Sequence, residues 1–287
     1  MRLVSFSISG GPSRPGLVHG DEIVDLSDPS TGLPATMREV LALGARALDQ
    51  ARAAAIGGAP RVAREEVTLR APVPDPPAIL AIGMNYRDHA AELGREPPQW
   101  QYWFNKQRTA IAGPGDPIVL PAVSDAVDYE GELALVIGPR CQHVPAARAL
   151  EVVAGYTVIN DVTARDLQRR HDQWFKGKGL DGSCPMGPVV VHRSRITDPQ
   201  GLNITLRING ETRQNSNTKH MIFDLKVIIE QLSLGMTLEA GDVIATGTPS
   251  GVGFAMTPPG LLKHGDLIEA EVEGIGVLRN RVQETGR

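Results

Sequence analysis

Three acidic side chains are spaced as oxygen ligands for a hard divalent cation. Glu130 and Glu132 flank one glycine ahead of the apolar run LALVIG, so on a strand both would project from one face beside a buried segment. Asp161 ends the apolar segment YTVIND, just before a helix signal. Neighbouring carboxylates repel unless a cation, a shared proton or solvent separates them, and their oxygens suit Mg²⁺, Mn²⁺ or Ca²⁺. The acids predict a metal site; the alternative is an exposed edge strand and a turn-capping acid.

A histidine and a glutamate are spaced as a proton-transfer pair. His89 and Glu92 stand three residues apart in NYRDHAAELG, whose AAEL segment favours a helix, so both would lie on one helix face. A carboxylate that orients an imidazole makes it a better base. Gly83 and Gly94 border this element and would let it move as a lid, with the aromatic residues at 100–104 as an apolar cover. The alternatives are an exposed helix with a local ion pair, and aromatic residues in the core or a dimer interface.

Two glycine-rich segments offer contacts to an anion. Lys178 lies in FKGKGLDGSCPMGP, where a lysine could pair with a carboxylate or an oxyanion, unless it is an ordinary surface lysine. The segment TGTPSGVG at 246–253 follows an apolar strand and presents backbone N–H groups and hydroxyls. It lacks the Lys-Ser/Thr pair of a phosphate-binding P-loop, which argues against nucleotide binding.

Strands must position these residues, because the apolar runs are short, β-branched and bounded by turn residues. Asn209-Gly210 predicts a type I′ hairpin. Strands are expected at 2–8, at 17–26 with a turn at Gly20-Asp21, and at 118–120, 133–137, 189–191 and 267–272. Helices are few: they are expected from Thr36, which forms a capping box with Glu39, to about Ala55, and at 146–154, 163–172 (with Thr163 and Asp166 as an approximate capping box) and 222–233.

Four prolines between residues 72 and 77 stop regular structure and predict a boundary near residue 73. The chain is thereby divided into a small α+β N-terminal domain, residues 1–72, and a mainly β domain, residues 73–287.

Composition excludes several classes of protein. Of 287 residues 41% are hydrophobic, and 29 Lys+Arg against 33 Asp+Glu give a net charge of −4, which argues against a disordered chain and against a nucleic-acid partner. The sequence contains neither an apolar run long enough to span a bilayer nor a signal-peptide core, so a cytoplasmic protein without a membrane partner is expected. Cys141 and Cys184 have no CxxC spacing and are expected to be ordinary thiols.

Six segments, in this order, resemble the fumarylacetoacetate hydrolase family over about residues 80–285. They are GMNYRDHAAE, YEGELALVIG, NDVTARDLQ, GKGLDGSCPMGP, NGETRQ and GDVIATGTPSGVG. The resemblance implies a mixed β-sandwich or roll, a homodimer, and a divalent cation, Mg²⁺ or Mn²⁺ with Ca²⁺ as a further possibility. The first 70 or so residues lie outside it.

The resemblance also assigns roles to residues. It implies Glu130, Glu132 and Asp161 as metal ligands, His89, Glu92 and Lys178 as catalytic residues, and Gln168 and Thr248 as substrate-binding residues. The larger fumarylacetoacetate hydrolases have a tyrosine four residues after that glutamine, whereas Asp172 stands here, which argues against fumarylacetoacetate as the substrate.

The expected activity is metal-dependent hydrolysis of a C–C bond in an acylpyruvate, a small 2,4-dioxo acid. The cation would stabilise the enolate of the 2-oxo acid, and His89 would activate water. The same enolate arises in other reactions, so two alternatives stay open: oxaloacetate decarboxylase, and 2-hydroxyhepta-2,4-diene-1,7-dioate isomerase, as in bacterial aromatic catabolism. An alternative of another class is a non-catalytic β-rich protein with a structural metal site.

Overall fold

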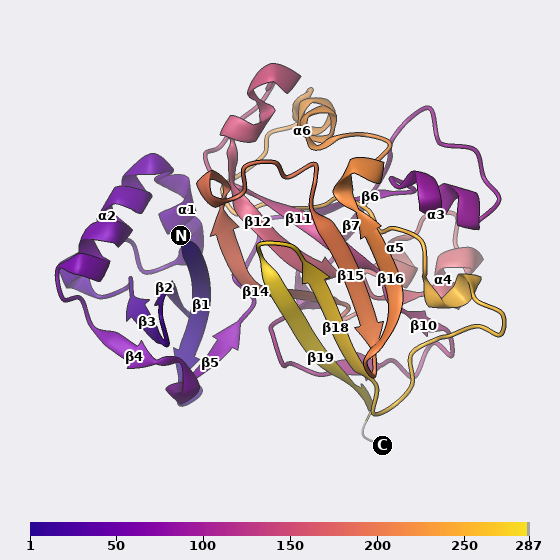
Figure 1. The fold of residues 1–287 in the computed structure, drawn as a ribbon, viewed down its shortest axis with the longest axis horizontal. Coiled ribbons are helices and arrows are strands. Elements are labelled where there is room, and N and C mark those ends of the chain that lie inside the picture. Colours follow the sequence, from indigo (N-terminus) through magenta and orange to yellow (C-terminus); the bar gives the residue numbers. More distant parts are fainter. Residues whose placement is uncertain (286–287) are drawn as a thin grey trace.

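A computed structural model describes residues 1–285, and its central element is a mixed sheet of 12 strands (Figure 1). Its main path runs β4-β3-β2-β1-β14-β12-β11-β17-β6-β7, while β5 pairs with β1 and β8 pairs with β14. The strands of this sheet are β1 (Arg2–Ile8), β2 (Arg14–His19), β3 (Glu22–Asp25), β4 (Arg61–Ala63), β5 (Val67–Arg70), β6 (Ile79–Gly83), β7 (Tyr102–Lys106), β8 (Ile111–Ala112), β11 (Gly131–Ile137), β12 (Val153–Asn160), β14 (Cys184–His192) and β17 (Val243–Ala245).

A second sheet of five strands packs against the middle of the first. Its order is β16-β15-β18-β19-β9, and a short pair, β10-β13, lies apart from both. Their bounds are β9 (Ile118–Leu120), β10 (Val127–Asp128), β13 (Thr163–Ala164), β15 (Asn203–Ile208), β16 (Glu211–Asn217), β18 (Leu267–Val272) and β19 (Gly276–Glu284). Asn209 and Gly210 both have positive φ between β15 and β16, which confirms the predicted hairpin.

The core lies between the two sheets. Leu206 and Ile268 of the small sheet share one apolar cluster with Leu133 and Val158 of the large sheet. Burial alternates along β15 and β18, whereas all seven residues of β11 are buried, because β11 is covered on both faces. This architecture confirms a mainly β fold with few helices.

The helices are short and lie around the sheets. They are α1 (Met37–Ala42), α2 (Ala45–Ile56), α3 (Arg87–Glu92), α4 (Arg165–Arg170), α5 (Phe175–Lys178) and α6 (Leu225–Ser233), with 3₁₀ turns at Pro29–Thr31, Arg64–Glu66, Arg108–Ala110, Ala146–Glu151, Arg193–Arg195, Thr218–His220 and Gly253–Ala255. Thr36 caps α1 through the backbone N–H of Glu39, as predicted. No helix within residues 1–285 is long and apolar enough to cross a membrane.

Several predicted helix bounds were wrong. The helix expected at 36–55 is split at Gly44, whose φ of 55° interrupts the helical backbone. The segment at 146–154 is a 3₁₀ turn that ends at Glu151, before β12 begins. The helix expected at 163–172 spans only α4, because Thr163 belongs to β13 and donates to the carbonyl of Asp161 instead of capping α4. The last predicted helix begins at Leu225, after an Asp224 cap.

The N-terminal strands extend the large sheet. Strand β1 pairs antiparallel with β14, placing Arg2 opposite Val191 and Leu3 opposite Val190. In Figure 1 the indigo and purple N-terminal elements lie beside β14, with α1 and α2 covering them. The buried Ser5 hydroxyl donates to the carbonyl of Pro72 at 2.7 Å, in the proline-rich segment where the boundary was predicted.

Candidate active site

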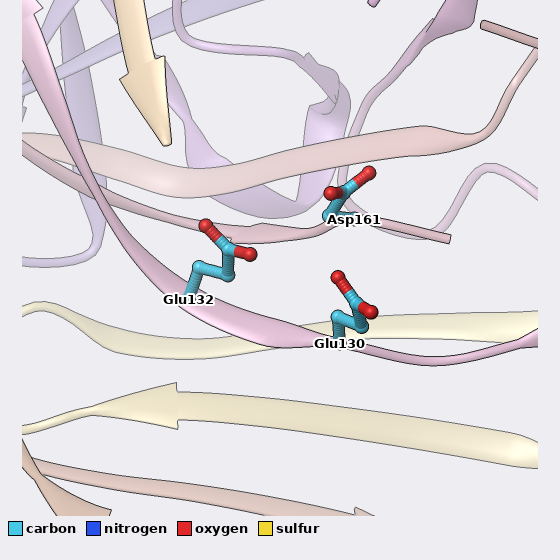
Figure 2. Close-up of side chains that lie close together, drawn as sticks. All are labelled: Glu130, Glu132 and Asp161. Atoms are coloured by element: carbon cyan, nitrogen blue, oxygen red, sulfur yellow. The ribbon is translucent and has the colours of Figure 1, made fainter. Parts of the chain in front are cut away.

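Three acidic side chains converge where two neighbouring strands meet their loops (Figure 2). Glu130 precedes β11, Glu132 is its second residue, and Asp161 directly follows β12. The two strands are antiparallel neighbours, with Glu132 opposite Ile159, and the N–H of Asp161 donates to the carbonyl of Glu130 at 2.8 Å. One oxygen from each acid lies within 4.8 Å of the others. The acids are at most 5% exposed, so the exposed edge strand and the solvent-facing turn cap are excluded.

Two cationic side chains contact the acidic cluster. Lys178, the last residue of α5, is 2% exposed, and its Nζ lies 2.7 Å from Glu130 and 2.6 Å from Asp161. Arg165, the first residue of α4, places its Nη2 2.7 Å from Glu130. The alternative of a surface-loop lysine at position 178 is therefore wrong. The two Lys178 contacts are charge-assisted hydrogen bonds, the strong kind, and the Arg165 contact is a buried ion pair.

The pKa values of the two glutamates move in opposite directions. Burial opposes ionisation of Glu130, but the adjacent Lys178 and Arg165 outweigh it and lower the pKa of this carboxyl to about 2. Burial raises the pKa of Glu132 well above its ordinary value, and the negative charges of Asp161 and Glu130 raise it further. The cluster therefore lacks one positive charge near Glu132.

A divalent cation fits this donor set. The three ligand groups are carboxylates, the hard oxygen donors that Mg²⁺ and Mn²⁺ take, and three protein ligands leave positions for substrate and water. A cation here would also supply the positive charge that Glu132 lacks. Glu130, Glu132 and Asp161 would hold it.

The predicted proton-transfer pair forms on α3. His89 Nδ1 lies 3.0 Å from Glu92 Oε2, and His89 is 5% exposed. Because an ionised carboxylate can only accept, Nδ1 carries the hydrogen of this bond and Nε2 of a neutral imidazole is left as an acceptor. The imidazole also lines the cavity described below, so the pair can transfer a proton there.

Hydrogen bonds to two other elements, the loop at 246–253 and β16, tie α3 and the residues just before it in place. Glu92 Oε1 accepts from the N–H of Gly251 at 2.8 Å, and Asp88 accepts from the hydroxyl of Ser216 on β16 at 2.6 Å. The buried Asn85 side chain donates to the carbonyl of Thr246 at 2.8 Å. Gly251 has a φ of 100°, and a Cβ there would lie 2.0 Å from the carbonyl oxygen of Arg213, so only glycine fits. The loop at 246–253 thus holds the proton-transfer pair.

A cavity of about 500 Å³ opens onto the acidic cluster. Of the predicted site residues, six line it, namely His89, Glu130, Glu132, Gln168, Lys178 and Thr248, while Asp161 and Glu92 lie behind them. Gln168 accepts from Arg165 Nη1 at 3.2 Å, which leaves its amide N–H₂ group to donate to a ligand. The Thr248 hydroxyl donates to the carbonyl of Gly131 at 3.0 Å and accepts from Gln214 at 2.8 Å.

Aromatic side chains form one wall of the cavity. Phe104 on β7 and Trp174 ahead of α5 both line it, with ring centroids 5.6 Å apart. Trp100 and Tyr102, from the same aromatic segment, are 75% and 55% exposed. Only part of the aromatic segment can therefore cover the site.

Sequence reasoning missed three residues of the site. Lys106 is buried at the end of β7 and donates to Asp161 Oδ1 at 2.6 Å. Asp128 is fully buried, lies 2.8 Å from Arg165 and accepts from the N–H of Gly253 at 2.8 Å. Asp128 and Arg165 stand inside the segments DYEGE and TARD, so their proximity to the predicted metal ligands was a usable signal. No such signal pointed to Lys106, because a lysine at a strand end is usually exposed.

Comparisons with known proteins match the part of the chain that carries this site. The family model "Fumarylacetoacetate (FAA) hydrolase C-terminal" matches residues 78–283. The chain is 50% identical over 221 residues to "Oxaloacetate tautomerase YisK" of Bacillus subtilis, which covers 76% of this chain and 73% of the relative. It is 42% identical over 287 residues to "Oxaloacetate tautomerase fahd2, mitochondrial" of Xenopus laevis, covering 98% and 90%.

A solved structure shows the same fold with a metal. Maleylpyruvate hydrolase from Sphingobium sp. SYK-6, in complex with manganese(II) ion and pyruvate, superposes with a TM-score of 0.83 at 34% identity, covering 100% of both chains. Family model, relatives and fold therefore agree over the segment that carries the acids, the lysine and the His–Glu pair. The chain belongs to the fumarylacetoacetate hydrolase family.

Proposed function

We propose that this protein is a metal-dependent enzyme that interconverts the keto and enol forms of oxaloacetate or a similar 2-oxo acid. The observation that carries the proposal is the buried cluster of Glu130, Glu132 and Asp161 in the same cavity as the imidazole of His89. The two relatives named as oxaloacetate tautomerases support the choice of reaction.

The chemistry follows from these residues. When bound, a divalent cation supplies positive charge that stabilises negative charge developing on the 2-oxo oxygen. Lys178 adds a second positive charge beside the same acids, and Gln168 donates its amide to the substrate. His89 Nε2 accepts a proton from C3 of the keto form while the oxygen at C2 takes a proton from water, and in the reverse direction it returns a proton to C3 while that oxygen loses its proton to water. Glu92 holds the imidazole in the tautomer that permits this.

A second candidate is hydrolysis of the C–C bond of an acylpyruvate. The His89–Glu92 pair favours it, because the same imidazole can deprotonate a water instead of a carbon, and the solved maleylpyruvate hydrolase with manganese and pyruvate supports it. Decarboxylation of oxaloacetate and isomerisation of a dienoic acid pass through the same enolate and remain further reactions to assay.

One panel of assays separates these activities. The purified protein is given enolic oxaloacetate, keto oxaloacetate and an acylpyruvate, each with Mn²⁺ and again with excess chelator, while enol loss and pyruvate release are followed. We expect chelator-sensitive enol loss and little pyruvate release. His89→Asn should lower the rate by about 10²- to 10⁴-fold, the usual contribution of general acid–base catalysis.

The outcomes are distinct. Pyruvate release from the acylpyruvate would move the assignment to hydrolase, and release from oxaloacetate would move it to decarboxylase. Metal binding without turnover of any 2-oxo acid would contradict the proposal and favour a structural metal site.

A further inference from the structure

The cavity contains more positive charge than the acidic cluster uses. Its lining includes Arg95, Arg165, Arg169 and Lys178. Arg165 and Lys178 are ion-paired with the cluster. Within residues 1–285, neither Arg95 nor Arg169 has an acidic side chain within ion-pair distance, although Asp and Glu outnumber Lys and Arg in the chain. These two guanidinium groups are therefore available to an anionic ligand.

With a divalent cation and one substrate carboxylate added, the charges of the inner site sum to zero without Arg95 or Arg169. Four buried carboxylates (Asp128, Glu130, Glu132 and Asp161) face three buried cationic side chains (Lys106, Arg165 and Lys178). A divalent cation would leave one positive charge in excess, and the single carboxylate of a 2-oxo acid would neutralise it. A guanidinium further out in the cavity is then left for a second negative charge.

Helix α4 and one aromatic ring position Arg169. Arg165 and Arg169 stand four residues apart on α4, so they share one helix face. Their guanidinium carbons lie 4.2 and 5.2 Å from the ring centroid of Phe254. The backbone N–H of Phe254 donates to Asp128 at 3.2 Å, which holds the main chain that carries the ring. Arg165 therefore faces the acids, while Arg169 forms the neighbouring outer wall of the cavity.

We propose that Arg169 is a specificity-determining residue that binds a second carboxylate of the substrate. Its planar guanidinium matches a carboxylate in two parallel hydrogen bonds, and stacking on Phe254 reduces the entropy lost in making them. The cavity then selects 2-oxo acids with a carboxylate at each end over acylpyruvates with one. This inference rests on the proposed function and specifies its substrate class.

The test compares oxaloacetate with its 4-methyl ester, which has nearly the same shape but lacks the second charge. kcat and KM are measured with Mn²⁺ for the wild type, for Arg169→Met and for the control Arg170→Met, which removes a neighbouring exposed charge that does not line the cavity. We expect kcat/KM of the wild type to be about tenfold or more higher for the diacid than for the ester. The difference is modest because Arg169 is exposed to solvent, which weakens its attraction for a carboxylate.

Arg169→Met should remove most of that preference by raising KM for oxaloacetate, while kcat on the ester stays the same and Arg170→Met behaves like the wild type. The wild-type preference should also weaken as salt is added. Equal Mn²⁺ affinity and equal thermal stability of the three proteins would show that the fold and inner site are intact.

An unchanged diacid preference in Arg169→Met, or an equal loss on both compounds, would overturn the role of Arg169. If the enzyme still turned over the ester in that experiment, the proposed function would be supported although the role of Arg169 was not. A wild type that acts on neither compound would overturn both.

Discussion

Asp161 lies between two buried lysines, and this is the tightest ionic contact of the site. Lys106 and Lys178 each place Nζ 2.6 Å from a different oxygen of Asp161. Both oxygens are thereby fixed in direction before a cation binds. Removing one member of a buried ion pair leaves an uncompensated charge, which is costly in free energy.

Lys106→Met should therefore lower the free energy of unfolding by about 3 kcal/mol. Urea unfolding followed by circular dichroism measures this, with Lys263→Met, at an exposed lysine, as the matched control. A variant as stable as the control would show that Lys106 contributes no net stabilisation.

The raised pKa of Glu132 determines how the stability of the metal-free protein should depend on pH. Its pKa in the folded protein is raised above the ordinary value of 4.5, so the protonated form is preferred on folding. This contribution to stability is present below pH 4.5 and is lost as pH rises through the folded pKa. With chelator, raising the pH above 4.5 should thus destabilise the wild type more than Glu132→Gln.

Melting temperatures across pH, with chelator and with Mn²⁺, measure this effect. Mn²⁺ should restore stability at the higher pH, because it supplies the missing positive charge. Parallel pH curves for the wild type and Glu132→Gln would contradict the account.

For individual residues, burial distinguishes a functional site from an ordinary exposed surface. An E-x-E pair, a lone lysine and a His–Glu spacing each fit an exposed surface as well as a site, and only their order along the chain pointed to a site. The structure places all of these except Glu92 at 5% exposure or less. Sequence could not show that Lys106 joins them, because that contact depends on β7 pairing with β6 at the edge of the sheet.

At the scale of elements, α3 depends on its neighbours for position. It has six residues, too few for a stable isolated helix, so its hydrogen bonds to the loop at 246–253 and to β16 hold the His89–Glu92 pair. The glycines that flank α3 suggested that this helix could move as a lid. Any such opening must break its hydrogen bonds to the loop at 246–253 and to β16.

Ser216→Ala removes the hydroxyl that donates to Asp88. We expect kcat to fall by about tenfold, because losing a hydrogen bond worth roughly 1.5 kcal/mol weakens the positioning of α3, while Mn²⁺ affinity is unchanged. Steady-state kinetics and metal titration measure the two quantities, with the exposed Ser13→Ala as control. A parallel loss of metal affinity would mean that β16 supports the acids instead.

Elements set by local chemistry were easier to predict than elements set by tertiary contacts. The Thr36 cap and the Asn209-Gly210 hairpin followed from local chemistry, and both are present. Thr163 failed as a cap because its hydroxyl bonds to the carbonyl of Asp161, a contact set by the neighbouring strands. Tertiary hydrogen bonds therefore decided the ends of α4, which local sequence could not specify.

At the scale of the whole molecule, the N-terminal residues protect an edge of the large sheet. Strand β1 covers β14, whose residues Val190 and Val191 are buried. Without β1, this edge would present unpaired backbone groups between apolar side chains, a template for aggregation.

A chain of residues 73–287 alone should therefore aggregate or oligomerise. Size-exclusion chromatography at increasing concentration tests this, with co-expressed residues 1–72 as the rescue. A truncated chain that elutes as the full-length protein does, with the same melting temperature, would show that the predicted boundary separates independent folding units.

The proline-rich boundary was visible in the sequence, whereas the pairing of β1 with β14 was not. These strands are separated by about 180 of the 287 residues, and pairing over such a distance leaves no local signal. The mainly β class was predictable because it follows from the pattern of short apolar runs.

We propose that one positioned base, His89, transfers a proton at C3 of a 2-oxo acid beside the acidic cluster. The most direct test converts enolic oxaloacetate in deuterium oxide with Mn²⁺, traps the keto product at once by reduction to malate, and locates the deuterium by NMR. We expect label at one of the two C3 positions, because His89 approaches from a single face, and equal label at both positions when chelator is added. Equal label at both positions with Mn²⁺ present would contradict it.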